Sequence, residues 1–116
     1  MKPTRLLAPI ALAAALLAPA AASAITVKNC SGIPVRVHVY NNDDAALTVA
    51  RAGGKIEAGS QRAWGAGGGR VLVKVFRTGI FDQLVVTRGN LGARSGYHVA
   101  LDSNGNWAVR NNAGGC

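Results

Sequence analysis

The chain has 116 residues, a formal net charge of +8 and two cysteines. This length suits one domain, and two cysteines allow a single disulfide, which excludes a densely cross-linked scaffold. The basic excess favours anionic partners such as cell-wall polymers, lipid headgroups and acidic polysaccharides, with nucleic acid bound only through non-specific charge. The same charge could also serve solubility alone.

The first 24 residues follow the three-part pattern of a secretory signal peptide. A positively charged start precedes an apolar run over residues 6–18, and Ala22-Ser23-Ala24 then offers a small-x-small cleavage site. The run is shorter than the roughly 20 residues that span a bilayer, which disfavours a membrane anchor. We expect cleavage after Ala24, with Ala18-Pro19-Ala20 as the alternative site, and a secreted or periplasmic location.

Residues 25–116 then form one predicted all-β domain. Loss of Lys2 and Arg5 with the leader lowers the formal net charge to +6. Helical periodicity is nearly absent from this part, whereas period-two alternation is common. In chain order, the alternation predicts strands over residues 25–28, 35–40, 70–76, 97–102 and 106–110, and more weakly over 47–51, 55–58, 61–64 and 84–88.

Short turn signals separate these runs. They are Gly53-Gly54, Gly59-Ser60, Thr78-Gly79, Gly89-Asn90 and Asn104-Gly105. Asn104-Gly105 predicts a two-residue hairpin turn, because Asn-Gly accepts positive φ at both central positions. The pattern predicts a small antiparallel β-sandwich or barrel of about seven or eight short strands.

The two cysteines, Cys30 and Cys116, lie near the two ends of the predicted mature chain. An exported chain meets an oxidising compartment, so we predict one structural disulfide between them. A reactive thiol or a metal ligand is the alternative. The chain has no CxxC pair and no histidine beside either cysteine to support that alternative.

Two amides and two carboxylates, Asn41, Asn42, Asp43 and Asp44, follow directly on a predicted strand. Asn and Asp are favoured in turns because their side chains hydrogen-bond nearby backbone, and a turn accounts for all four. The alternative is a Ca²⁺-dependent binding module, because Ca²⁺ takes six to eight oxygen ligands. Asp82, Asp102 or Glu57 could complete that site in space. No other cofactor is expected.

Five basic side chains fall on the polar phase of predicted strands. If the strands share a sheet, the five make one cationic face beside Tyr40 and Phe76. Such a face could bind an anionic surface or polymer. The alternative is a solvated face that discourages edge-to-edge pairing. The five residues are Arg36, His38, Lys74, His98 and Arg110.

Catalysis has little support in the sequence. His38 and His98 are the only histidines, and no GxSxG elbow is present. Asp43 and Asp44 are adjacent, so on extended backbone they would point to opposite faces rather than across a cleft. We therefore expect a non-catalytic binding protein, with a small secreted hydrolase and a protein–protein interaction domain as alternatives.

The stretch Thr26-Val27-Lys28-Asn29-Cys30 resembles the opening strand of thaumatin-like proteins. The resemblance covers these five residues, and thaumatin-like proteins carry many disulfides where this chain can form one. It implies no function for the chain.

Overall fold

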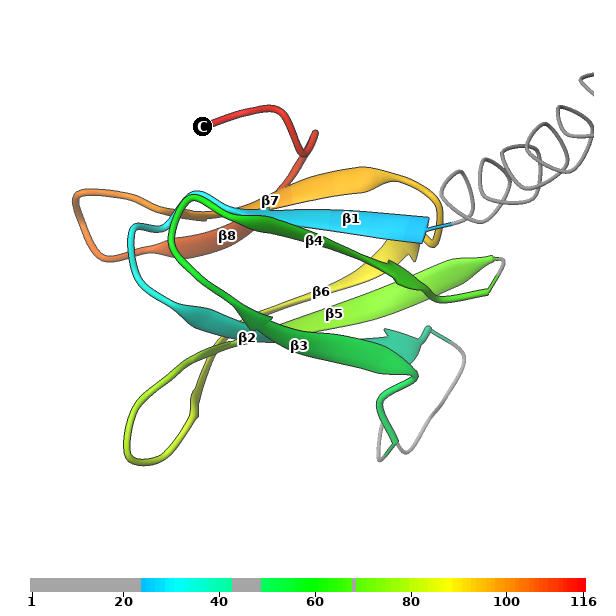
Figure 1. The fold of residues 1–116 in the computed structure, drawn as a ribbon, viewed down its shortest axis with the longest axis horizontal. Helices are drawn as coiled ribbons and strands as arrows, with labels where there is room; N and C mark the ends of the chain where they lie inside the picture. Colours follow the sequence, from blue (N-terminus) through cyan, green and yellow to red (C-terminus); the bar gives the residue numbers. More distant parts are fainter. Residues whose placement is uncertain (1–23, 43–48, 68) are drawn as a thin grey trace, which may run out of the picture.

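The computed structural model describes residues 24–42, 49–67 and 69–116. These residues form strands and turns without a helix, so the predicted all-β class is confirmed (Figure 1). The eight strands are β1 (Ala24–Asn29), β2 (Val35–Asn41), β3 (Ala52–Ile56), β4 (Gln61–Gly65), β5 (Arg70–Arg77), β6 (Gln83–Gly92), β7 (Gly96–Leu101) and β8 (Trp107–Asn111).

The strands form two four-stranded sheets with one core between them. Sheet A has the order β4-β1-β7-β8, and sheet B has the order β3-β2-β5-β6. All pairs but one are antiparallel; β1 and β7 run parallel, with Val27 opposite Tyr97. The prediction of a wholly antiparallel arrangement is wrong at this pair, because alternation fixes which face a residue takes and not the direction of its neighbour.

The core follows the predicted alternation. Val35, Val37 and Val39 of β2 are fully buried, and Val73 and Val75 of β5 lie opposite Val39 and Val37 in the same sheet. Sheet A meets them with its own fully buried residues, among them Ile25, Val27 and Val99. A slip of one residue would turn each apolar set towards solvent, so burial fixes the register.

Two predicted turns are instead parts of strands. Gly53-Gly54 lies in β3, where Gly53 pairs with His38 at a φ of 147°. A Cβ at Gly53 would clash with the carbonyl oxygen of Val37, so only glycine allows this close approach. Gly89-Asn90 lies in β6 at a register shift against β5, with Asn90 in the left-handed region at a φ of 58°.

The strand predicted weakly over residues 47–51 is absent at residues 49–51, and residues 47–48 lie outside the described ones.

The predicted hairpin at Asn104-Gly105 exists, but its turn is longer than expected. β7 and β8 are connected by the loop Asp102–Asn106, and only Gly105 has a positive φ, 83°. The backbone N–H groups of Asn106 and Asn104 each donate to Asp102 Oδ1 at a distance of 2.9 Å. These bonds, led by that from Asn106, hold the pKa of the Asp102 carboxyl below its ordinary value.

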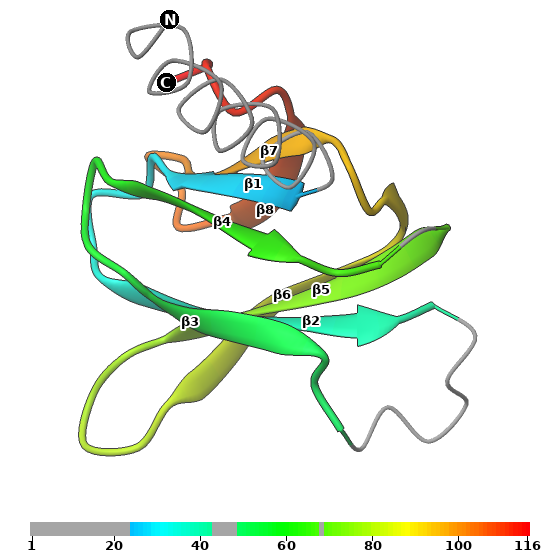
Figure 2. The same cartoon turned by 45° about the vertical axis from the view of Figure 1, so that its right-hand side comes forward.

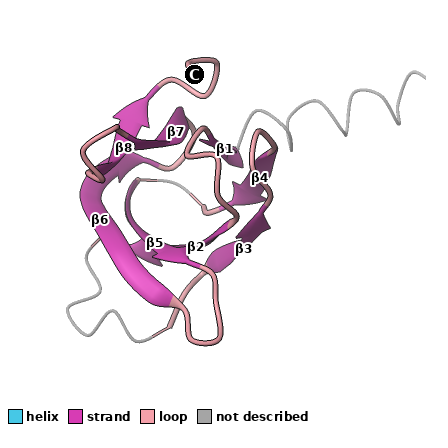
Figure 3. Ribbon diagram, turned by 90° about the vertical axis from the view of Figure 1, so that its left-hand side faces the viewer, coloured by secondary structure: helices cyan, strands magenta, loops and turns pink. Residues whose placement is uncertain are grey.

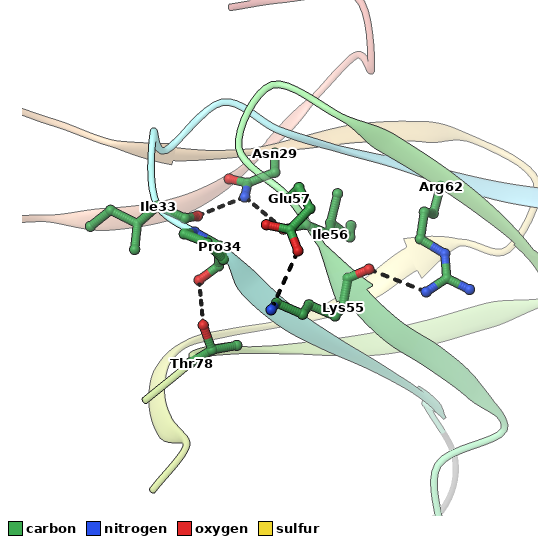
Figure 4. A network of polar contacts seen from close by, with 8 residues as sticks. All are labelled: Asn29, Ile33, Pro34, Lys55, Ile56, Glu57, Arg62 and Thr78. Atoms are coloured by element: carbon green, nitrogen blue, oxygen red, sulfur yellow. Dashed lines mark hydrogen bonds and ion pairs between the residues drawn. The ribbon is translucent and has the colours of Figure 1, made fainter. Parts of the chain in front are cut away.

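Asn29 is the one fully buried polar residue of the described core. Its Nδ2 donates to the carbonyl oxygens of Ile33, at 2.7 Å, and Ile56, at 3.0 Å (Figure 4). Its Oδ1 accepts from the backbone N–H of Ser31 at 3.0 Å and from the Ser31 hydroxyl at 2.6 Å. One amide thus joins the end of β1, the β1–β2 connection and the end of β3.

The disulfide between Cys30 and Cys116 is present, with the two Cα atoms 5.4 Å apart. It links the residue after β1 to the last residue of the chain, as predicted. The segment after β8 is held further by His98, whose Nδ1 lies 2.7 Å from the carbonyl oxygen of Asn112.

Among the described residues no strand ladder joins sheet A to sheet B, and at each side an edge strand of one sheet faces an edge strand of the other (Figure 3). We call these sides the β3/β4 seam and the β6/β8 seam. Arg62 of β4 crosses the first, where its Nη1 donates to the carbonyl oxygen of Lys55 at 3.2 Å. Arg88 of β6 crosses the second, where its guanidinium donates to the Val109 carbonyl at 2.6 Å and to Asn111 Oδ1 at 2.9 Å.

The predicted signal peptide falls on residues 1–24, of which 1–23 lie outside the described residues. Ala24 pairs with Gly65 at the outer end of β1, so cleavage after Ala24 would remove only the first residue of that strand. Among the residues that the structure describes, no helix is long and apolar enough to cross a membrane.

Candidate binding surface

The five predicted basic residues do not share one face. Arg36 and His38 lie on β2 and Lys74 on β5, in sheet B, whereas His98 and Arg110 lie on β7 and β8, in sheet A. All five take the phase opposite the buried residues of their strands. Since the core lies between the sheets, the two groups face opposite sides of the molecule. The single cationic face was expected only if these strands shared a sheet, and they do not.

In sheet B the basic residues alternate with aromatic ones across β2 and β5. His38 lies opposite Lys74, and Arg36 lies opposite Phe76. Directly opposite residues of an antiparallel pair project from the same face of the sheet. We call this surface the cationic-aromatic face; it consists of Arg36, His38, Tyr40, Lys74 and Phe76.

Side-chain contacts give the cationic-aromatic face a fixed arrangement. The Lys74 ammonium nitrogen lies 5.1 Å from the centre of the Tyr40 ring, within the range of a cation–π contact. The His38 ring packs against Phe76 with the ring centres 4.8 Å apart, and its Nδ1 lies 3.3 Å from the Tyr40 hydroxyl. Tyr40 is only 7% exposed despite its outward phase, so it acts chiefly as a support for Lys74 and His38.

Carboxylates offset part of the charge at one end of this face. Arg36 Nε donates to Asp82 Oδ2 at 3.0 Å, with the two side chains 41% and 36% exposed. Lys55, beside Arg36 on β3, pairs with Glu57 at 3.3 Å. Among the ion pairs of the described residues, none involves Lys74. Lys74 is therefore the cation of the face that is most available to an external anion.

The basic residues of sheet A form a different row. Lys28 of β1, His98 of β7 and Arg110 of β8 lie side by side in register. His98 is occupied with the C-terminal segment, since its Nδ1 contacts the carbonyl oxygen of Asn112 and its ring lies close to where a Cβ at Gly115 would be. Lys28 was not among the predicted binding residues, although its place on the polar phase of β1 was visible in the sequence. No aromatic side chain interleaves this row on the outer face of β1, β7 and β8.

The predicted calcium ligands are only partly described. Asn42 Oδ1 accepts from the backbone N–H of Asn90 at 2.7 Å, which ties the end of β2 to the irregular part of β6. Asn41 ends β2 and is exposed. Asp43 and Asp44 lie outside the described residues. The described residues contain no cluster of three or more His, Cys, Asp or Glu side chains that could hold a metal ion.

The carboxylates proposed to complete a calcium site have other partners. Asp82 pairs with Arg36 and Glu57 with Lys55, both beside sheet B. Asp102 receives the N–H groups of its own hairpin turn in sheet A. The calcium module therefore stays a prediction that rests on Asn41, Asn42, Asp43 and Asp44.

Sequence reasoning missed the apolar tip of the β5–β6 loop. Ile80 is 97% exposed and Phe81 is 88% exposed, and Leu84 at the start of β6 is 48% exposed. A signal was present, because two large apolar residues occur directly after the turn signal Thr78-Gly79. Turn positions ordinarily take polar residues, glycine or proline, so this pair breaks the pattern.

No protein-family model, no curated protein and no solved structure matches the chain. The five-residue resemblance to thaumatin-like proteins gains no support from these comparisons.

Proposed function

We propose that the chain is an exported, non-catalytic β-sandwich protein that binds anionic surfaces or polymers through the cationic-aromatic face. The observation that carries the proposal is the position of Lys74 and Arg36 on adjacent strands, with His38 and Phe76 packed against each other beside them and the Tyr40 ring under the Lys74 ammonium group. The sandwich assignment is supported by the side-chain bridges of Arg62 and Arg88, which cross the seams where no ladder pairs the sheets.

Export is supported by two independent features. The first 24 residues have the pattern of a signal peptide, and the disulfide between Cys30 and Cys116 is suited to an oxidising secreted or periplasmic compartment. Amino-terminal sequencing of the secreted or periplasmic protein should begin at Ile25. Recovery of the protein only in an uncleaved cytoplasmic form would contradict export.

The chemistry of the face suits repeated or clustered anions. Lys74 presents an ammonium group that is steadied by the Tyr40 ring, so its position is restricted before a ligand arrives. Arg36 contacts Asp82 through Nε, and the other N–H donors of its guanidinium can bind an incoming phosphate, sulfate or carboxylate while that contact is kept. The Phe76 ring adds apolar area beside both cations.

The test compares two lysines that differ in which sheet carries them. Lys74→Gln removes one charge from the cationic-aromatic face, and Lys28→Gln removes one charge from the outer face of sheet A. Both variants have the same net charge. We expect Lys74→Gln to weaken binding of a sulfated polysaccharide about fivefold, which corresponds to about 1 kcal/mol, and Lys28→Gln to weaken it less than about twofold.

Salt dependence gives the second arm of the test. Affinity of the wild-type protein should fall as salt rises from about 0.01 M to 0.15 M, where the screening length shortens from about 30 Å to 8 Å. Equal losses of affinity in the two lysine variants would show that net charge alone drives binding, and binding could then not be assigned to the cationic-aromatic face. Binding that does not change with salt would reject the electrostatic proposal altogether.

A further inference from the structure

The loop between β5 and β6 presents two large apolar side chains to solvent. It spans residues 78–82 and projects beyond sheet B (Figures 1 and 2). Ile80 and Phe81 stand at its tip with 97% and 88% of their surface exposed. Of the large apolar side chains that the structure describes, these two are the most exposed, and they are adjacent in sequence.

The tip is held at both of its bases. The Thr78 hydroxyl donates to the carbonyl oxygen of Pro34 at 3.1 Å, which attaches the first side of the loop to the β1–β2 connection (Figure 4). Asp82 accepts from Arg36 Nε at 3.0 Å, which attaches the second side to β2. A loop fixed at both sides presents Ile80 and Phe81 without first having to be ordered, and such preorganisation favours binding.

The apolar surface continues from the tip onto the sheet. Phe76 lies opposite Leu84, so both project from the outer face of sheet B at the end nearest the loop. Leu84 is 48% exposed. Basic residues lie beside this apolar surface on the same outer face: Arg36 lies opposite Phe76, and Lys55 lies opposite Arg36. Arg77 ends β5 in the other phase, opposite the buried Val35.

We propose that Ile80 and Phe81 insert into the interface of an anionic lipid membrane while the basic residues beside this apolar surface contact the headgroups. The shape favours lipid, because a convex two-residue tip needs a soft apolar medium to enter, and interfacial apolar groups enter bilayers by about 5–10 Å. The charge favours an anionic lipid, because the described residues and the whole chain both carry a basic excess. This inference deepens the proposed function, on which it rests, by naming a lipid surface as the anionic partner.

Vesicle sedimentation tests the insertion. Vesicles of phosphatidylcholine with phosphatidylglycerol should bind the purified protein, and vesicles of phosphatidylcholine alone should bind it at least about tenfold more weakly. Ile80→Ser with Phe81→Ser should reduce binding to the anionic vesicles by tenfold or more, because each side chain loses its transfer into the apolar phase. Val49→Ser is the matched control, since Val49 is 70% exposed but lies beyond the other end of β2; it should bind as the wild type does.

A fluorescent variant reports the depth of the tip. Phe81→Trp places an indole at the tip, and its emission should shift to the blue on anionic vesicles and be quenched by brominated lipid chains. Trp64 and Trp107 give the background, which the wild-type protein measures directly. Emission that stays unshifted and unquenched while the protein is vesicle-bound would overturn the insertion.

The remaining outcomes separate this inference from the proposed function. If the tip double variant binds anionic vesicles as well as the wild type does, insertion is wrong, while salt-dependent binding of the sulfated polysaccharide would leave the proposed function standing. If the wild type binds neither vesicles nor polysaccharide, both fail. If the tip variant changes only the self-association of the protein in sedimentation, the tip is a contact between copies and the lipid inference is overturned.

Discussion

The β3/β4 seam and the β6/β8 seam both join the two sheets through an arginine side chain, but the two arginines make different numbers of hydrogen bonds. In each, an arginine occupies the core-facing phase of an edge strand: Arg62 lies opposite the buried Val27, and Arg88 lies opposite the buried Val73. Inward-pointing charges on edge strands discourage pairing with a further strand. Here each charge reaches across to the other sheet, so the same side chain protects an edge and joins two layers.

The difference lies in what accompanies each arginine. Arg62 is exposed and makes one bond to a carbonyl, beside a Trp64 whose buried Nε1–H lacks a partner among the described residues. The chain itself closes that seam, because β3 and β4 are consecutive strands connected at residues 57–60. Arg88 is half-buried and makes two bonds, and β6 and β8 are not consecutive. Side-chain bonds therefore matter more where chain connectivity does not close the seam.

Loss of the disulfide should lower the free energy of unfolding more than any other change, and it should destabilise the β6/β8 seam more than the β3/β4 seam. Replacing Cys30 and Cys116 by serine removes the constraint on a long loop, which is worth up to about 4 kcal/mol in the free energy of unfolding. Denaturant unfolding of the oxidised wild type and the double variant measures the loss. Hydrogen exchange should accelerate more at Val109 in β8 than at Ala63 in β4; equal acceleration would break the distinction between the seams.

Asn29→Ala should give the next largest loss in the free energy of unfolding, and it should act on the side of the β3/β4 seam. The substitution leaves the carbonyl oxygens of Ile33 and Ile56 without their donor, and we expect a loss of about 3 kcal/mol in the free energy of unfolding. Asn104→Ala, the same substitution at an exposed turn position, should change stability by less than about 0.5 kcal/mol. Similar losses in the two variants would mean that the buried amide is not what connects β1 to β3.

The two arginines can be compared directly. Arg88→Met should cost about 2 kcal/mol in the free energy of unfolding, since the Val109 carbonyl and Asn111 Oδ1 lose their charged donor. Arg62→Met should cost about 0.5 kcal/mol, since its bond is exposed. Methionine preserves the long apolar stem in both variants. Chemical denaturation of the pair gives the ranking, and the reverse order would show that connectivity does not decide how much a seam depends on its side chains.

The smallest effect should come from Asp102, which lies in the β7–β8 turn outside either seam. Its pKa is lowered in the folded state, so its bonds to the N–H groups of Asn106 and Asn104 stabilise the fold above the unfolded-state pKa. That stabilisation is lost as the pH falls through the folded-state pKa. Asp102→Ala should therefore lower the melting temperature slightly near neutral pH and have a smaller effect in strong acid. A difference that grows towards low pH would show that the sign is wrong.

Local patterns predicted most strands because burial alternates with period two along them. β2 follows that rule from Val35 to Val39, and β5 follows it from Val71 to Val75. The predicted position of β3 was displaced towards the C-terminus because Gly53-Gly54 resembles a turn. Glycine is needed at Gly53 because the carbonyl oxygen of Val37, in another strand, lies close to it. Such a contact leaves no trace within a short window of sequence.

The candidate site was predicted residue by residue but not as a surface. The polar phase correctly placed Lys74 and His98 on outward faces. Which sheet each strand joins depends on long-range pairing, and the parallel pairing of β1 with β7 places His98 on the side opposite Lys74. Arg62 and Arg88 were assigned no role, because their partners lie in the other sheet.

The burial of Asn29 has a consequence for how the protein can be produced. Asn29-Cys30-Ser31 fits the acceptor triplet for N-linked glycans, Asn-X-Ser/Thr, which must be reachable to be modified. In the folded protein the Asn29 side chain is fully buried, and both its Nδ2 and its Oδ1 make hydrogen bonds. A eukaryotic secretory host would transfer sugar only before the chain closes, and a glycan installed there would hold the β1–β2 connection open. Bacterial periplasmic expression avoids that competition between modification and folding.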